Sequence, residues 1–301
     1  MEQAIIDHYV FYGMIRKLTF KTMHVRLYAV KRLHLVNGID LDFSRMPQLK
    51  MVIRGFKRIT RGPRRKLAIS VKMVRDLIAN GGLDLSKWDD LIQATAVLFG
   101  FFFLLRSSEY LRTEHGIDTD KCIRMEHLTF YRDGTLIDGD EDATRVCLFL
   151  PFSKTSITGN GVSLVLDADP GNPLCVVGMC NRLRAMKPHR FRECVGDRHV
   201  FSYSNGTVLH KSSVQKLLKE AAKRAGFDPA DFTSHSLRAG GASAMYHNGF
   251  SAEEIQRRGR WVSDVWKVYI QGNSEGAETM TRRMSTNSTM LHDRLKGSWT
   301  A

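Results

Sequence analysis

The most apolar run of the chain, Ala94–Leu105, constrains its folding more than any other feature of the 301-residue sequence. The run is too short to cross a bilayer, which takes about 20 residues. A stretch this apolar has no polar face to turn toward water, so we predict a buried helix. Ser86 is a residue type that caps helix N-termini, which predicts a helix from Lys87 to about Leu104.

Most of the remaining sequence carries helical patterns, with apolar side chains spaced three or four residues apart. Met23, Leu27 and Val30, for example, mark one face of a helix that Asn37-Gly38 ends. Helices are predicted over Tyr9–Ile15, Thr22–Val36, Gln48–Lys57 and Ala68–Ala79, from Asn172-Pro173 to about Met186, over Ser213–Ala225, from His235 with Ser234 as its cap, from Ser251 with Glu254 completing a capping box, and over Glu278–Met284.

Three short runs of β-type residues interrupt the helices in the middle of the chain. They are His127–Tyr131, Arg145–Phe152 and Val162–Leu166. Pairs such as Asp133-Gly134 and Asp138-Gly139 separate them, and these pairs are typical of tight turns. Short strands joined by tight turns form antiparallel sheets. The predicted fold class is therefore mainly α with a small antiparallel β-sheet (α+β).

Positive charge is concentrated between Arg45 and Arg75, where eleven Lys or Arg residues occur without one Asp or Glu. The whole chain has a formal net charge of +14. Self-repulsion is tolerated better beside an anionic partner, so we predict contact with the phosphates of a polyanion. A solvated linker and a nuclear-import signal are the alternatives. The residues that would make this contact are Arg54, Lys57, Arg58, Arg61, Arg64, Arg65 and Lys66.

The cysteines and the N-terminus exclude some classes of protein. Acidic side chains at Glu2 and Asp7 argue against a signal peptide. No CxxC or CxxH pair occurs among the five cysteines, so neither a metal site, zinc included, nor a disulfide framework is expected, and no cofactor is predicted. Reduced thiols in a cytosolic or nuclear compartment fit best. The cysteines are Cys122, Cys147, Cys175, Cys180 and Cys194.

The segment Thr233–Arg238 carries the first sign of chemistry. His235 and Arg238 lie three residues apart on one face of the predicted helix, near its N-terminus. Helix N-termini favour anions, and an arginine there can direct two donors to one phosphate while the histidine adds a third. An HxxR pair alone is also common on ordinary surface helices, so the surrounding residues decide between the two interpretations.

Further reactive side chains occur at separate points of the chain. Tyr269 follows Trp261 by eight residues. Arg106 and Glu109 come at the end of the apolar run, and Lys154 stands between two predicted strands. Together with the HxxR pair, these residues resemble the catalytic pattern of the tyrosine recombinases and integrases. That pattern is an arginine with a nearby acid, a lysine in a β-turn, HxxR, a His or Trp, and a tyrosine, and seven ordered positions form a strong signal.

The resemblance covers Ala68–Ile270 and implies two domains. Residues 1–61 would form a helical DNA-clamping domain, like the core-binding (SAM-like) domain of the family but short and without its first helix. Residues 62–67 would form a basic linker, and residues 68–301 the tyrosine recombinase catalytic domain with a C-terminal tail. The resemblance also implies double-stranded DNA as the partner, self-association as a dimer or tetramer on DNA, and no membrane contact.

The same resemblance implies a site-specific recombinase or integrase that cuts and rejoins DNA through a 3′-phosphotyrosyl intermediate without a metal. A tyrosine with its ordinary pKa near 10 is a poor nucleophile at neutral pH, so local activation is required. The resemblance assigns the nucleophile to Tyr269, phosphate binding to Arg106 and Arg238, further hydrogen bonds to His235 and Trp261, the general acid to Lys154, and support of the arginines to Glu109.

Two features depart from the bacterial and phage members of the family. Gly240-Gly241 and the alanines beside them stand where a His-Thr pair is usual after Arg238. The spacing from Trp261 to Tyr269 is one residue shorter than is common. Both features resemble the recombinases of eukaryotic mobile elements, the Crypton and DIRS types. That subfamily implies a nuclear location, whereas other members of the family imply the cytoplasm.

Three other functions are compatible with the sequence. The first is a catalytically inactive or domesticated DNA-binding protein derived from a mobile-element recombinase. The second is a type IB topoisomerase, which shares the chemistry but acts as a monomer on supercoiled DNA. The third is an RNA-binding or scaffold role that rests on charge alone. Trapping on nicked DNA separates the catalytic functions from the others, because only an active nucleophile becomes covalently attached.

Overall fold

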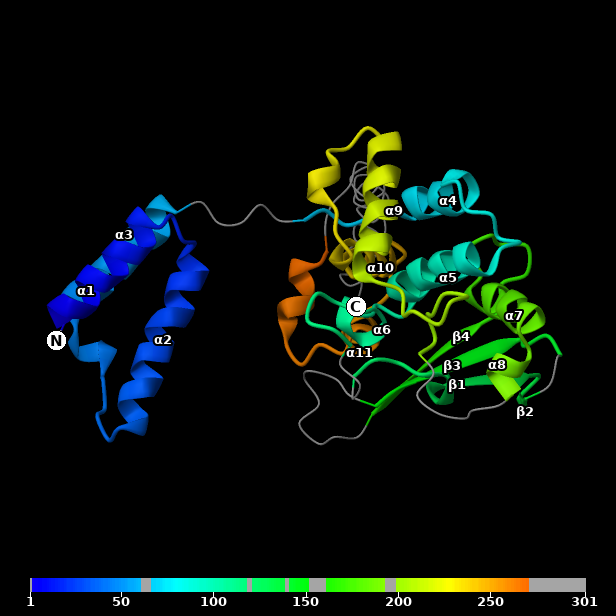
Figure 1. The fold of residues 1–301 in the computed structure, drawn as a ribbon, viewed down its shortest axis with the longest axis horizontal. Coiled ribbons are helices and arrows are strands. Elements are labelled where there is room, and N and C mark those ends of the chain that lie inside the picture. Colours follow the sequence, from blue (N-terminus) through cyan, green and yellow to red (C-terminus); the bar gives the residue numbers. More distant parts are fainter. Residues whose placement is uncertain are drawn as a thin grey trace, which may run out of the picture. The chain divides into compact units, whose positions relative to one another are not determined.

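The computed structural model describes residues 2–60, 66–117, 121–138, 141–151, 161–192 and 199–270. The chain divides into two compact units, Met1–Arg65 and Lys66–Ala301 (Figure 1). The division lies within residues 62–67, which the sequence assigns to a linker. The DNA-clamping role of the first unit stays a prediction. The helix expected over Glu278–Met284 lies outside the described residues.

The described part of the first unit consists of α1 (Glu2–Val10), α2 (Phe20–Val36) and α3 (Pro47–Ile59), with a π-helical stretch at Phe11–Ile15. Gly38, with a φ of 76°, ends α2 as predicted. The helices predicted for this region are confirmed, although the first begins well before Tyr9. They enclose a small core of Ile6, Tyr9, Met23, Leu27, Leu49 and Phe56.

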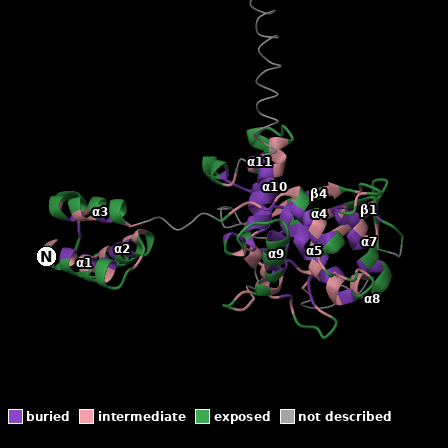
Figure 2. Ribbon diagram, turned by 90° about the horizontal axis from the view of Figure 1, so that it is seen from above, coloured by how far each residue is buried: buried purple, intermediate pink, exposed green. Residues whose placement is uncertain are grey.

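The second unit packs its helices around α5 (Trp88–Phe102), which is the predicted buried helix. Eleven of its fifteen residues are buried. It contacts four other helices of the unit, and Figure 2 shows buried residues gathered along α5 and α10. The other described helices are α4 (Val71–Asn80), α6 (Ser107–Tyr110), α7 (Val176–Met186), α8 (His189–Arg192), α9 (Lys211–Arg224), α10 (His235–His247) and α11 (Ala252–Gly259).

A small antiparallel sheet lies beside these helices, with the strand order β2-β1-β3-β4. The predicted strands are confirmed, and the short β2 was not predicted. Asp133 and Gly134 form the turn between β1 and β2 with φ values of 51° and 87°, both in the left-handed region that such hairpin turns require. Alternate residues of the strands, such as Val146 and Leu148, are buried in the main core. The strands are β1 (Leu128–Arg132), β2 (Thr135–Ile137), β3 (Arg145–Leu150) and β4 (Val162–Asp167).

Two predicted helix starts were wrong because the local side chains hydrogen-bond elsewhere. The Ser86 hydroxyl donates to the Asp84 carboxylate at 2.6 Å instead of capping α5. The Asn172 side chain accepts the backbone N–H of Leu174 at 2.9 Å, which forms a turn and delays α7 to Val176. Short polar side chains compete in this way with helix formation.

The predicted cap of α10 was also wrong, although the helix does begin at His235. Ser234 already has helical φ and ψ angles and makes no side-chain cap bond. The Thr233 hydroxyl instead accepts the backbone N–H of His235 at 3.3 Å. In contrast, the capping box of Ser251 and Glu254 at the start of α11 is confirmed.

The two glycines after Arg238 allow α10 to pack closely against its neighbours. A Cβ on Gly241 would lie 2.1 Å from the carbonyl oxygen of Phe101, at the end of α5. A Cβ on Gly240 would lie 2.2 Å from the carbonyl oxygen of Ile69. Atoms cannot approach this closely, so the Gly-Gly pair that departs from the bacterial pattern brings Arg238 to the end of α5.

We expect Gly241→Ala to lower the free energy of unfolding by about 1–3 kcal/mol, because the added methyl group forces the two helices apart. Gly178→Ala in α7 is the matched control, since its Cβ would lie 3.5 Å from the nearest atom, which is ordinary contact distance. Urea denaturation measures both. Unchanged stability of Gly241→Ala would show that the helix crossing is looser than described.

Among the described residues, none of the helices combines the length and the hydropathy that crossing a bilayer requires. The same residues contain no group of three His, Cys, Asp or Glu side chains that could hold a metal ion.

Candidate active site

The chain turns sharply where α5 ends. Leu104 has a φ of 50°, in the left-handed region that usually favours glycine, and a leucine costs about 1–2 kcal/mol there. The N–H of Leu105 donates to the Gly100 carbonyl oxygen at 3.3 Å, as in a Schellman helix end. The Leu104 carbonyl oxygen, which has left the helix, accepts hydrogen bonds from the guanidinium groups of Arg238 and Arg260.

Arg238 lies in the first turn of α10 and is 0% exposed. Its Nη1 donates to the Leu104 carbonyl oxygen and its Nη2 to the Gly259 carbonyl oxygen, the latter at 2.5 Å. Its guanidinium carbon lies 4.5 Å from the centre of the Trp261 ring. Its Nε–H is buried and has no hydrogen-bond partner in the described parts of the chain. The guanidinium therefore keeps donors for a further acceptor.

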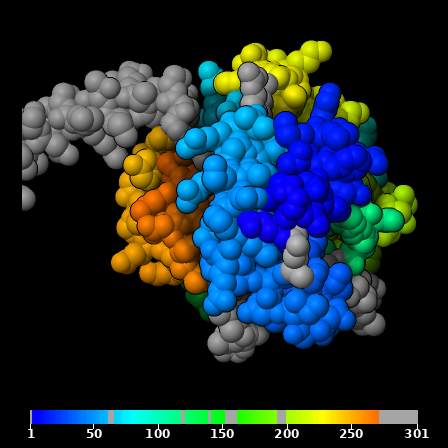
Figure 3. Space-filling view, turned by 90° about the vertical axis from the view of Figure 1, so that its left-hand side faces the viewer, coloured from blue at the N-terminus to red at the C-terminus, as the bar shows by residue number. Residues whose placement is uncertain are grey.

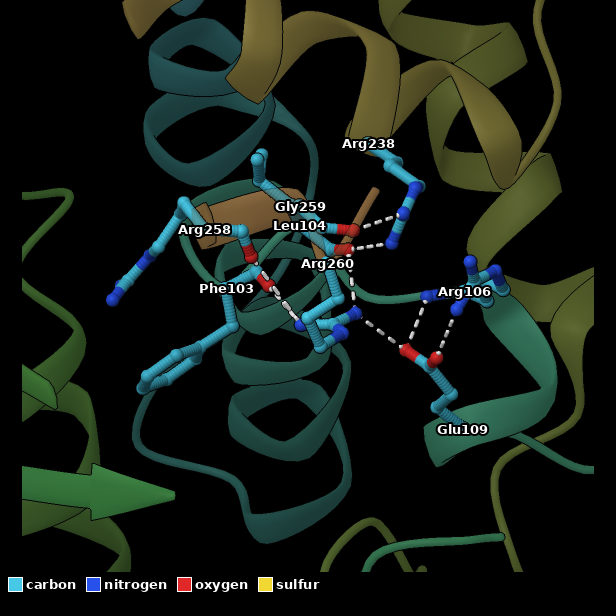
Figure 4. A network of polar contacts seen from close by, with 8 residues as sticks. All are labelled: Phe103, Leu104, Arg106, Glu109, Arg238, Arg258, Gly259 and Arg260. Carbon is cyan, nitrogen blue, oxygen red and sulfur yellow. Dashed lines mark hydrogen bonds and ion pairs between the residues drawn. The ribbon is translucent and has the colours of Figure 1, made fainter. Parts of the chain in front are cut away.

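Glu109 connects two further arginines, as Figure 4 shows. It lies in α6, directly after the turn, and is 4% exposed. One carboxylate oxygen accepts Nη1 of Arg106 and the other accepts Nη2 of Arg260, each at 2.9 Å. The Arg106 side chain is 23% exposed to solvent, so it reaches the protein surface, whereas the Arg260 side chain is 3% exposed.

Positive charge exceeds negative charge in this cluster. Three arginines, Arg106, Arg238 and Arg260, lie around the single carboxylate of Glu109, which pairs with Arg106 and Arg260 but not with Arg238. Burial, with Arg260 and Arg106 nearby, lowers the pKa of Arg238 to about 9, which is still above neutral pH. Burial also lowers the pKa of Arg260. Because buried charges without full compensation are costly, this arrangement favours binding of an anion.

Tyr269 lies against the same cluster. Its ring centre is 5.0 Å from that of Trp261 and 5.1 Å from that of His235. The guanidinium carbon of Arg238 is 5.9 Å from the centre of the Tyr269 ring. Trp261 is buried and Tyr269 is half-buried. The Tyr269 ring therefore packs beside the buried guanidinium group of Arg238.

His235 lies at the first position of α10, and the residue is exposed. Desolvation of its ring, with Arg238 and Arg106 nearby, holds the pKa of His235 below its ordinary value. The imidazole is therefore neutral at neutral pH, with one N–H donor and one acceptor nitrogen.

Of the seven residues that the family pattern selects, the structure places six in this cluster. Lys154 lies outside the described residues. The six are Arg106, Glu109, His235, Arg238, Trp261 and Tyr269.

The fold and the sequence of this unit match known proteins. The XerH site-specific recombinase, solved with a palindromic difH substrate in a post-cleavage complex, aligns with a TM-score of 0.57 and 12% identity over 97% of this chain and 72% of that chain. The Tn1549 transposon integrase, solved with transposon right end DNA, aligns with a TM-score of 0.54 and 12% identity over 94% of this chain and 85% of that chain. Residues 178–274 match the phage integrase family. The second unit has the fold of a tyrosine recombinase domain.

A curated relative of the tyrosine recombinase domain extends beyond this chain. The integrase/recombinase XerD homolog of Selenomonas ruminantium is 28% identical over 196 residues, which are 63% of this chain and 50% of that protein. The chain thus spans about half the length of the relative it matches. The finer resemblance to Crypton-type and DIRS-type recombinases stays a prediction.

The predicted DNA-binding residues are distributed over both units. Arg54, Lys57 and Arg58 are exposed on α3, which is light blue in the space-filling view of Figure 3, and they form no ion pair within the described residues. In the tyrosine recombinase unit, Lys66 donates its Nζ to the Ala230 carbonyl oxygen at 2.6 Å. The remaining three, Arg61, Arg64 and Arg65, lie outside the described residues.

Arg260 was not among the site residues that the sequence predicted, although it stands directly before Trp261. A signal for Arg260 was present in the spacing. The distance from Trp261 to Tyr269 is one residue shorter than is common in the tyrosine recombinase family, and the common spacing counted back from Tyr269 ends on Arg260. The structure separates the two neighbours. Trp261 packs on Tyr269, whereas Arg260 turns inward and pairs with Glu109.

Proposed function

We propose that this protein is a site-specific DNA recombinase or integrase that cuts and rejoins DNA through a covalent bond between Tyr269 and a DNA phosphate. Buried Arg238 carries the proposal. It forms no ion pair with a carboxylate among the described residues, keeps an unpartnered N–H, and has its guanidinium carbon 5.9 Å from the centre of the Tyr269 ring. A phosphodiester supplies the missing negative charge and the acceptor oxygens, and it places a phosphorus atom near the tyrosine.

The proposed reaction is an in-line transfer of the phosphoryl group. The Tyr269 oxygen bonds to phosphorus and loses its proton, while the bond to the 5′ oxygen of the next nucleotide breaks. The products are a 3′-phosphotyrosyl link and a 5′ hydroxyl, and attack by a 5′ hydroxyl reverses the step to rejoin the strands. We assign the proton for the leaving 5′ oxygen to Lys154, because an ammonium group can supply it.

The other site residues would stabilise charge as the transition state forms. Arg106, which reaches the surface, and Arg238 would donate to the non-bridging oxygens, where a preorganised donor has its largest effect. Neutral His235 would donate one N–H there. Trp261 offers only its indole N–H, so it can hold an oxygen but cannot transfer a proton. We assign no metal ion to the reaction.

Duplex DNA is the proposed partner of both units, as the charge of +14 supports. We propose that residues 1–61 clamp DNA, with Arg54, Lys57 and Arg58 of α3 on its phosphates, and that residues 62–67 continue this contact. The catalytic domain would span residues 68–301. Self-association on paired DNA sites, as a dimer or tetramer, completes the proposal, because joining strands from two duplexes requires more than one active site.

A nicked duplex tests the proposal directly. When cleavage occurs close to a nick, the short 5′-hydroxyl strand diffuses away and the protein stays attached to DNA. We expect a randomised pool of labelled, nicked duplexes to give a protein–DNA adduct that survives denaturing electrophoresis, with the same yield in the presence of EDTA. DNA binding without any adduct would contradict the enzymatic proposal and leave a non-catalytic DNA-binding protein.

A further inference from the structure

Arg260 occupies an unusual backbone position. It follows α11 as the C-terminal cap residue, with φ of 55° and ψ of 45°, in the left-handed region. Side chains other than glycine are disfavoured there, and such strain persists only where surrounding contacts maintain it. The Arg260 residue is 7% exposed, so its guanidinium group lies inside the protein.

Arg260 donates hydrogen bonds to the two groups that also hold Arg106 and Arg238, the arginines that we assign to the phosphate. Its Nη2 donates to the Glu109 carboxylate at 2.9 Å and to the Leu104 carbonyl oxygen at 3.0 Å. The same carboxylate holds Arg106, and the same carbonyl oxygen accepts Arg238. Figure 4 shows Arg260 between these two supports.

We propose that Arg260 is a positioning residue, which fixes Arg106 and Arg238 relative to each other so that both can bind one phosphate. It is buried and makes its described polar contacts with protein groups, so we assign it no contact with DNA. This inference rests on the proposed function, since it concerns the same site. An arginine suits the role because its rigid fork can donate in several directions at once, whereas a lysine is a point charge.

Arg258 is a matched control two residues earlier in the chain. It is half-buried, whereas Arg260 is buried, and its Nε and Nη1 donate at 3.0 Å to the carbonyl oxygens of Phe102 and Val165. Its backbone carbonyl oxygen accepts Nη1 of Arg260 at 3.5 Å, a contact that a side-chain substitution keeps. None of its described side-chain contacts involves Glu109, Arg106 or Arg238. Loss of its side chain should therefore perturb packing to a similar degree without moving the site.

The first test is a double-mutant cycle on the rate of adduct formation with nicked duplexes. We expect Arg260→Met to lower this rate about 100-fold, the usual effect of displacing a reacting group by about 1 Å. Glu109→Gln should lower it as well, and the double variant should be little worse than either, because both changes release the same pair.

Arg258→Met should keep the wild-type rate and act independently of Glu109→Gln. Arg260→Lys, which keeps the charge, repeats the test if Arg260→Met does not fold.

The second test measures binding of inorganic phosphate, through the rise in melting temperature that phosphate causes. Arg238→Ala should lose this rise in melting temperature if the phosphate binds at the site, so this variant identifies where phosphate binds. We expect the half-saturating phosphate concentration to rise about tenfold in Arg260→Lys, because one of two coordinating arginines is misplaced. It should stay unchanged in Arg258→Met.

The two tests separate this inference from the proposed function. If the wild type forms no adduct, the proposed enzymatic function fails, but phosphate binding still decides the role of Arg260. Wild-type phosphate binding by Arg260→Lys would overturn the positioning role, and so would independent effects of Arg260→Met and Glu109→Gln on the adduct rate.

Discussion

Tyr269→Phe should abolish covalent attachment to nicked DNA and leave duplex binding intact. The substitution removes the only oxygen that could bond to phosphorus in the proposed mechanism. It keeps the ring that packs on Trp261 and His235, so the site should retain its structure. Denaturing electrophoresis measures the adduct, and a binding titration at fixed salt measures affinity, since affinity for DNA varies steeply with salt.

Tyr246→Phe is the matched control, because Tyr246 is an exposed tyrosine of α10 outside the described contacts of the site. It should form the adduct at the wild-type rate. Adducts that persist in Tyr269→Phe would refute the assignment of the nucleophile, and peptide mapping of the attached residue would then identify the true one.

Arg238→Lys should lower the rate of adduct formation about 10³-fold at saturating DNA, as loss of a preorganised donor to the transition state does. Lysine keeps a positive charge but cannot donate to Leu104, Gly259 and a phosphate in the fork geometry of arginine. Because the charge is retained, the effect should be on the rate more than on DNA affinity. Single-turnover kinetics with the nicked pool measure it.

Arg224→Lys is the control for this prediction. Arg224 is an exposed arginine of the same unit whose Nε pairs with Asp76 at 2.8 Å. Its substitution should leave the rate unchanged, because exposed ion pairs contribute little. A wild-type rate in Arg238→Lys would rule out the idea that the buried guanidinium holds the phosphate.

The large elements of the fold could be predicted because each has a local cause in the sequence. The apolar run at Ala94–Leu105 cannot face water on any side, and it forms the end of the buried α5. The strands β1, β3 and β4 followed from runs of β-type residues and from turn chemistry, whereas the short β2 after Asp133-Gly134 did not. Predictions of single caps were less successful, since Ser86 and Asn172 could bond in more than one way and distant packing selected between them.

The candidate site was predicted only in part. Residues such as Arg106, His235 and Tyr269 could be selected because a family pattern preserves their type and order. Arg260 could not, because a pattern of residue types carries no information about which neighbour turns inward. That choice depends on the left-handed backbone at Arg260 and on the Glu109 carboxylate, which is 151 positions away in the chain.

The fold class, the basic character of the chain and the order of its reactive residues follow from the amino-acid sequence alone, because hydrophobic period, charge and turn residues act over a few neighbouring positions. The tertiary structure alone brings Arg106 and Arg260 onto one carboxylate, with Arg238 beside them at the end of α5. It also decided that Tyr269 lies beside them. The contacts of Arg260 with Glu109 and of Arg238 with Leu104 join residues more than a hundred positions apart, and they depend on close helix packing at Gly240 and Gly241 that no local pattern encodes.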